Sequence, residues 1–183
     1  MHYLHKILVH IPDVDDEGEN KEELKELIRS KAEDVTENYA DQTFDWRETE
    51  SAGGWKEDYP EQVYIAADNL EWFLNELECV LASQKHEIDC CLKNITEQCG
   101  TDLNMLVNGL WNISDEYDKT RPGYNDFTAY YLSKIGKMLH GEYISDSMFF
   151  NASAYTARLY QSDIEQIKAA PQDWALVMFD YHN

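Results

Sequence analysis

The acidic stretch near the start of the chain has residue types and spacing that could bind calcium. Residues 13–20 read DVDDEGEN. The first half of an EF-hand loop, with its oxygen ligands and its glycine at the sharp turn, is matched by Asp13, Asp15, Glu17 and Gly18. The twelfth position, where a bidentate Glu should complete the site, is Leu24, and the preceding residues read as a strand. The stretch is therefore predicted to be a solvated loop that leads into an acidic helix.

A second group of residues has the chemistry of a metal site. Cys79, His86 and Cys90 recur on one face of a predicted helix, and a His and a Cys four residues apart can share a metal ion. A zinc site needs a fourth ligand and usually has closely paired cysteines, so ordinary thiols are the alternative interpretation. All four cysteines fall on this helix, which favours reduced thiols, and we predict no metal and no cofactor.

Two pairs of titratable residues could transfer protons. His10 lies near Asp13, and Asp180 and His182 are two residues apart, so on a strand they share a face. A structural hydrogen bond is the simpler interpretation of each pair. The phosphate-binding and hydrolase motifs GxxxxGK, GxGxxG, GxSxG and HExxH do not occur. The sequence therefore predicts no catalytic residues and a protein that is not an enzyme.

The balance of charge is strongly acidic. The 183 residues contain 36 Asp and Glu against 15 Lys and Arg, which gives a net charge of −21 and a pI near 4.4. The net charges of residues 1–60, 61–120 and 121–183 are −10, −9 and −2. This asymmetry favours one acidic face, with solvated helix surfaces as the alternative. Autonomous binding to nucleic acid is not expected.

The elements that would position these residues follow from hydrophobic spacing. Strands are predicted within residues 5–11, 43–50, 147–159 and 173–182. Helices are predicted over residues 21–40, from an Asp68 cap to Gly100, from Thr101, over 127–139 and over 162–171, with a loop at 114–126. The sequence thus predicts one α+β domain over residues 1–183. Its small, mainly antiparallel sheet combines strands from both ends of the chain, and several helices, one of them long and central, pack with it.

The long helix carries an apolar stripe with alternating steps of four and three residues. Its members are Leu70, Leu74, Leu77, Leu81, Gln84, Ile88, Cys91, Ile95 and Gln98. Such a stripe is either the spine of the domain's own core or the seam of a homodimer. We expect the spine, and a monomer or a homodimer both remain possible. No basic leader with an apolar core opens the sequence and no apolar run could span a bilayer, so we expect a cytoplasmic protein that does not enter a membrane.

Three segments resemble a known group of proteins. They are MHYLHKILVHIPD at the start, FDWRETESAGGW in the middle and DWALVMFDYH at the end. Together they resemble small acidic proteins carried by phages and conjugative elements of gut bacteria, a group that includes inhibitors of type II CRISPR nucleases. The resemblance implies a non-enzymatic inhibitor in the cytoplasm of a bacterial host, with an RNA-guided nuclease as its partner. It supplies no functional residues.

The charge pattern suggests how such an inhibitor could bind. An RNA-guided nuclease holds nucleic acid in channels lined by Lys and Arg, which a surface rich in carboxylates could occupy. The expected contact surface combines the acidic loop, the outer face of helix 21–40 and two aromatic anchors. Its residues are Asp13, Asp15, Asp16, Glu17, Glu19, Glu22, Glu23, Glu26, Trp55 and Tyr59. The alternative is a dimeric scaffold or regulatory protein of a mobile element that uses the helix of residues 70–98 as its interface.

Overall fold

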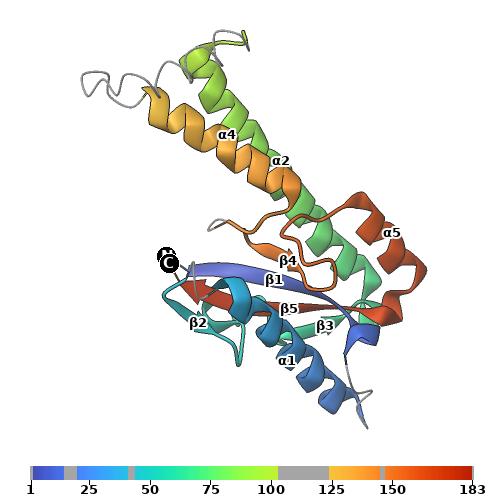
Figure 1. Cartoon of the computed structure of the whole chain (residues 1–183). Coiled ribbons are helices and arrows are strands. Elements are labelled where there is room, and N and C mark those ends of the chain that lie inside the picture. Colours follow the sequence, from blue (N-terminus) through green and yellow to red (C-terminus); the bar gives the residue numbers. More distant parts are fainter. Residues whose placement is uncertain (1, 15–19, 41–43, 103–123, 145–146, 183) are drawn as a thin grey trace.

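The structure is a computed structural model that describes residues 2–14, 20–40, 44–102, 124–144 and 147–182. Its strands are β1 (His2–His10), β2 (Trp46–Glu48), β3 (Val63–Ile65), β4 (Phe149–Asn151) and β5 (Trp174–His182). Its helices are α1 (Lys21–Ala40), α2 (Leu70–Cys99), α4 (Tyr124–His140) and α5 (Gln161–Ala169). Figure 1 shows the sheet between α1 on one side and α2 with α5 on the other.

The two longest strands come from opposite ends of the chain and pair along their whole length. β1 and β5 are antiparallel, from His2 opposite His182 to His10 opposite Trp174. β4 pairs in parallel with the other edge of β1, and both β2 and β3 pair with the remaining edge of β5. The predicted α+β class, with a mainly antiparallel sheet built from both ends of the chain, is therefore confirmed, and the sheet contains one parallel pair.

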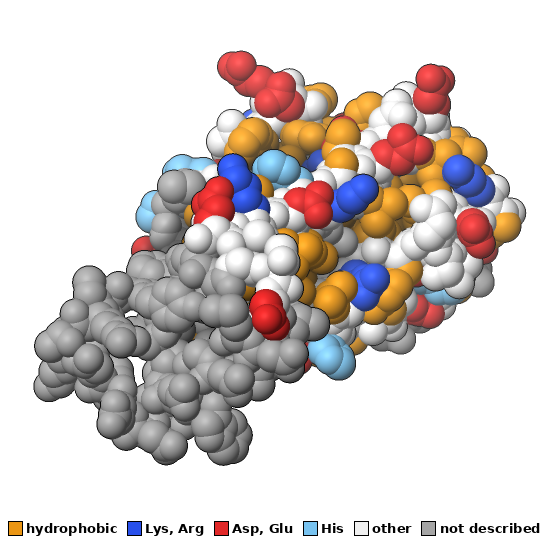
Figure 2. Space-filling view, turned by 90° about the horizontal axis from the view of Figure 1, so that it is seen from above, with side chains coloured by type: hydrophobic (Ala, Val, Ile, Leu, Met, Phe, Trp, Pro, Cys, Tyr) orange, Lys and Arg blue, Asp and Glu red, His pale blue; other side chains and the backbone are white. Residues whose placement is uncertain are grey.

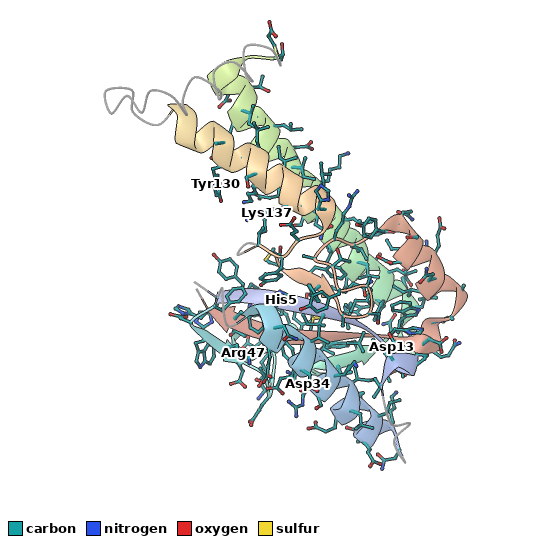
Figure 3. The ribbon with its side chains drawn as sticks, viewed as in Figure 1. His5, Asp13, Asp34, Arg47, Tyr130 and Lys137 are labelled. Atoms are coloured by element: carbon teal, nitrogen blue, oxygen red, sulfur yellow. The ribbon has the colours of Figure 1, made fainter. Side chains whose placement is uncertain are left out.

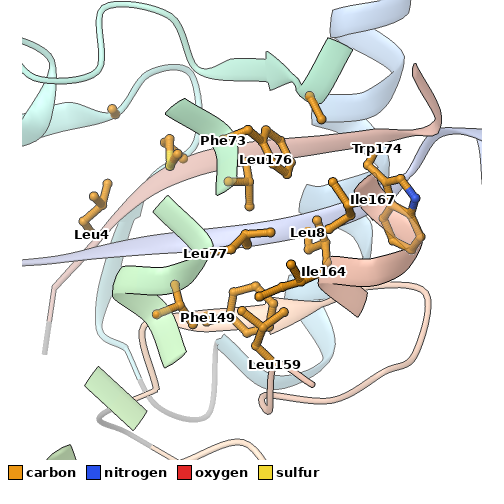
Figure 4. Packing of buried hydrophobic residues seen from close by; sticks show 14 residues of the cluster. Leu4, Leu8, Phe73, Leu77, Phe149, Leu159, Ile164, Ile167, Trp174 and Leu176 are labelled. Carbon is orange, nitrogen blue, oxygen red and sulfur yellow. The ribbon is translucent and has the colours of Figure 1, made fainter. Parts of the chain in front are cut away.

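The sheet buries both of its faces, which explains why β5 is a nearly continuous apolar run. On one face, Ile28 and Ala32 of α1 pack with Ile7 of β1 and Val177 of β5. The opposite face contacts α2 and α5, and its buried residues include Leu4, Leu8, Phe73, Leu77, Phe149, Ile164, Ile167 and Leu176 (Figure 4). Alternate residues of each strand thus serve different clusters, as the pleat requires.

The long helix α2 serves two parts of the structure. Its first half lies on the sheet, where Phe73, Leu77 and Val80 are buried. Its second half extends beyond the sheet and contacts α4 (Figure 1), and Cys91 and Ile95 are buried there. Leu77, Cys91 and Ile95 belong to the apolar stripe, and Phe73 and Val80 lie beside it on the helix. All five are covered within a single chain, which is the arrangement that a spine requires.

The cap and the partners of α2 differ in detail from the sequence prediction. Asn69, not Asp68, caps the helix, because its side chain accepts a hydrogen bond from the Trp72 amide at 3.2 Å. Asp68 belongs to the preceding 3-10 turn and forms an ion pair with Lys21 at 2.7 Å. Gln84 is polar within the stripe because its amide binds the backbone of residues 157–159.

Three further segments depart from the predicted elements. β3 was not predicted, and the strand expected within residues 147–159 is only three residues long. It ends there because the Asn151 side chain accepts two backbone hydrogen bonds, from Ser153 and Ala154, and folds the chain into a turn. Helix α4 begins at Tyr124, inside the expected 114–126 loop. The helix predicted from Thr101 lies almost entirely outside the described residues.

Candidate functional site

Three bases on one side of the molecule are less exposed than the acids that bind them. Lys25 pairs with Glu61, Arg29 with Glu26, and Arg47 with Glu37. The three basic side chains are 18%, 21% and 19% exposed, whereas their acidic partners are 59%, 65% and 59% exposed in the same order. A molecule that approaches this side therefore meets carboxylates first.

Contacts between α1 and the segment after it assemble these groups into one surface. Arg29 Nη1 donates a hydrogen bond to the Thr49 carbonyl at 3.4 Å, and Lys25 reaches Glu61. The described part of residues 20–68 contains 13 acids and 6 bases. We use the name acidic surface for six exposed carboxylates of α1 and of the segment that these contacts hold against it, namely Glu22, Glu23, Glu26, Glu37, Glu50 and Glu61.

Ion pairing favours the charged form of Glu26, one carboxylate of the acidic surface. The Arg29 guanidinium, hydrogen-bonded to Glu26, holds the pKa of that carboxyl below its ordinary value. Arg29 also contacts Glu33 at 3.1 Å, one helical turn further on. The surface can therefore attract cationic groups over the whole physiological pH range.

The acids predicted to bind a partner are only partly brought together. Glu22, Glu23 and Glu26 lie exposed on the first turns of α1 and belong to the acidic surface. Asp13 lies at the turn after β1 (Figure 3), where hydrogen bonds from Ser153 and His10 lower its pKa. The remaining predicted acids lie outside the described residues; they are Asp15, Asp16, Glu17 and Glu19.

The two predicted aromatic anchors lie elsewhere. Trp55 and Tyr59 pack against the buried cluster on the α2 side of the sheet, not with α1. The Tyr59 hydroxyl donates a hydrogen bond to Glu76 Oε2 at 3.0 Å, and Lys6 Nζ binds the same oxygen at 2.6 Å. Burial, followed by the Glu76 charge, raises the pKa of Tyr59. The structure thus separates these side chains from the acidic surface.

The arrangement of covered bases was missed by the sequence prediction. The ion pairs of Arg29 could have been predicted, because Glu26, Arg29 and Glu33 have the three- and four-residue spacing of helical ion pairs. The pairs of Lys25 with Glu61 and of Arg47 with Glu37 join separate elements, so no local pattern indicates them. From above, where Figure 2 views the molecule, acids and bases are instead scattered among hydrophobic side chains.

Asp180 and His182 have different hydrogen-bond partners, although both side chains contact His2. The Asp180 carboxylate is buried and contacts His2 Nδ1 at 3.0 Å, and it accepts a hydrogen bond from the Gly54 amide at 2.7 Å. His182 Nδ1 instead contacts Asp45 at 2.8 Å. These contacts fasten β1 and the 3-10 turn Gly53–Trp55 to β5, which is a structural role.

The candidate metal residues contact each other but form no larger group. His86 Nε2 lies 3.5 Å from Cys90 Sγ, whereas Cys79 is exposed two turns away. Within the described ranges, no three His, Cys, Asp or Glu side chains are placed to hold a metal ion. The three cysteines whose side chains the structure describes, Cys79, Cys90 and Cys91, are all free thiols.

The most strongly shifted histidine lies inside the protein. His5 is fully buried among Phe44, Tyr143 and Tyr181, and its Nε2 lies 3.2 Å from the Tyr143 hydroxyl (Figure 3). Burial disfavours the charged imidazolium and lowers the pKa of His5 to about 3. The side chain is therefore neutral at physiological pH.

We expect this histidine to make the protein less stable in mild acid. His5 binds a proton near pH 6.5 in the unfolded chain and does not in the folded chain. Its contribution to the free energy of unfolding is therefore complete above pH 6.5 and is lost as the pH falls toward 3. Between pH 7.5 and 5 this amounts to about 2 kcal/mol. Urea unfolding at both pH values gives the free energy of unfolding of the wild type and of His5→Asn. The loss of this free energy between pH 7.5 and pH 5 should be larger for the wild type. His140→Asn removes an exposed histidine on α4 and should lose as much free energy of unfolding between the two pH values as the wild type does.

The geometry of the acidic surface supports binding to a cationic partner. Its carboxylates are exposed, three of the neighbouring bases are largely covered, and the Arg29 guanidinium favours the charged form of Glu26. No helix in the described part of the chain has the length and apolar character needed to cross a membrane. No protein-family model, no curated protein and no solved structure matches the chain.

Proposed function

We propose that the protein is a non-enzymatic inhibitor that binds a bacterial type II RNA-guided nuclease through the acidic surface and blocks DNA binding or cleavage. The observation that carries this proposal is the layering of charge, in which each covered base lies under a more exposed acid. The class of partner comes from the resemblance of the three segments described above. On this proposal the protein acts in the cytoplasm of a bacterial host.

The physical basis is competition for a basic channel. A guided nuclease binds its heteroduplex through backbone contacts in a positively charged channel, and these contacts do not depend on base sequence. Exposed carboxylates on the rigid frame of α1 and the following segment can pair with the same Lys and Arg side chains. Because such attraction acts through solvent, it accelerates association at low salt and weakens as salt is added.

A cleavage assay with purified type II nucleases tests the proposal. The protein is titrated before and after the target DNA is added, at low and at high salt. We expect inhibition when the protein is added first, and weaker inhibition at high salt. The absence of inhibition across several such nucleases would overturn the proposal.

Matched variants test whether the acidic surface is the contact. Neutralising Glu22, Glu26 and Glu61 together with glutamine should weaken inhibition about tenfold or more, because several carboxylate contacts are lost. The control replaces three exposed acids elsewhere, and its positions are Glu71, Glu78 and Glu165. Both variants change the net charge equally, so a similar loss in both would show that overall charge and not this surface governs binding. Thermal unfolding of each variant checks that it is folded.

A further inference from the structure

A cavity of about 800 Å³ lies on the α2 side of the sheet, away from the acidic surface. It is bounded by α2, the first part of β1 and the chain on either side of β4. Much of its wall is apolar and includes Leu4, Leu81, Ile88, Met138, Met148 and Phe149. Its size falls in the range of pockets that hold small organic ligands, and its apolar walls are typical of them.

The charged residues around the cavity are unusual for this protein. Three bases and two acids line it, although the whole chain has a net charge of −21. One of the acids, Glu87, already binds Lys134 at 2.7 Å. Of the bases, Lys6 binds Glu76 and Arg158 donates to the Leu139 carbonyl. The local charge therefore favours an anion, in contrast to the rest of the surface.

Lys85 is the base best placed to bind that anion. It lies on α2, is exposed, and lines the cavity beside the apolar residues of the same helix. An ammonium group on a flexible stem can reach a ligand head group at the cavity mouth while the body of the ligand contacts the walls. The cavity thus offers an apolar space and a cation next to each other.

We propose that this cavity binds a small apolar molecule that carries a single anionic group, of the class of the aliphatic monocarboxylates. The apolar body occupies the space between α2 and β1, and the carboxylate pairs with Lys85. The site goes beyond the proposed function and does not depend on it, because the acidic surface lies on the α1 side of the sheet. Loss of ligand binding and loss of nuclease inhibition can therefore be observed separately.

The chain contains its own reporter of occupancy. Cys79 is exposed and lines the cavity, whereas Cys90 on the same helix does not line it. Dodecanoate at ten times its dissociation constant should slow alkylation of Cys79 by iodoacetamide about tenfold, since only the unoccupied protein reacts. Alkylation of Cys90 should not change, and peptide mass spectrometry resolves the two thiols. Absence of protection at Cys79, or equal protection at both, would overturn the proposal.

Two pairs of variants test the apolar space and the cation. Ser83→Phe places a ring in the cavity and should weaken dodecanoate binding about tenfold, because it fills the space that the ligand needs. Ala82→Phe, at the neighbouring exposed position outside the cavity, should bind as the wild type does. Equal effects of the two substitutions would contradict the assignment of the cavity.

The charge is tested with Lys85→Gln and its control Lys93→Gln, which lies on the same helix outside the cavity. The first should weaken dodecanoate binding about two- to fivefold and leave dodecanol binding unchanged, as expected for one exposed ion pair. If dodecanol binds the wild type as tightly as dodecanoate does, the proposal that the ligand needs an anionic group is overturned. Without any ligand, alkylation of Cys79 should not depend on protein concentration. If it slows as the protein concentration rises, a second copy of the chain occupies the cavity instead.

Discussion

The substitution Leu77→Ala is expected to lower the free energy of unfolding by about 4 kcal/mol. Leu77 is fully buried where the first half of α2 meets the sheet, among Leu8, Phe149 and Leu176 (Figure 4). Removing its branched end loses apolar burial and leaves a hole that strands of a paired sheet cannot close by moving. Urea unfolding at neutral pH measures the change as a shift in midpoint.

Leu92→Ala is the matched control for this prediction, because it makes the same change on the same helix. Leu92 is 48% exposed on the second half of α2, so its loss should cost less than about 1 kcal/mol. The unfolding midpoint of the wild type should also not depend on protein concentration. Similar costs for both variants, together with a midpoint that rises with concentration, would instead support the helix as a dimer seam.

Gly53→Ala is expected to lower the free energy of unfolding by about 3 kcal/mol, through two separate causes. Gly53 has a φ of +53°, a conformation that disfavours any side chain. A Cβ atom at this position would also lie 2.3 Å from Asp180 Oδ2. The substitution must therefore displace a buried carboxylate that holds both the Gly54 amide and His2. Thermal or urea unfolding measures the loss.

Gly100→Ala separates the two causes. Gly100 has a φ of +70° at the end of α2, and a Cβ atom there meets nothing within 4 Å. This variant should therefore show only a backbone cost, of about 2 kcal/mol, because its ψ of −160° belongs to a region that essentially only glycine occupies. If the two glycine variants lose equal stability, close contact with Asp180 is not a significant part of the cost.

Hydrophobic spacing predicted most of the larger elements. The helix of residues 21–40 matches α1, and the segment up to Gly100 matches α2, because periodic apolar residues mark both and Gly100 marks the end of the second. The apolar ends of the chain indicated the central strand pair. β3 could not be predicted, since three residues carry no readable period and are held in place by pairing with β5.

The candidate site was predictable in its charge and not in its geometry. Composition and the helix pattern indicated Glu22, Glu23 and Glu26. Trp55 and Tyr59 are close in sequence to acidic residues, but sequence proximity does not determine which face of a sheet a side chain joins. Here the turn held by Asp180 places them on the α2 side. The helical spacing indicated the ion pairs of Arg29, whereas the covering of Lys25 and Arg47 depends on tertiary packing.

The pairing of β1 with β5 also has a consequence for how the chain folds. Its first contact joins His2 to His182, so the sheet contains contacts between residues 180 positions apart in sequence. Contacts of such high order close very large loops, which slows folding. During synthesis β1 leaves the ribosome first and must wait for β5 before its long edge is paired. The nascent chain therefore exposes an unpaired apolar strand until translation has passed residue 182, which makes this the period in which it is most open to aggregation and to chaperone binding.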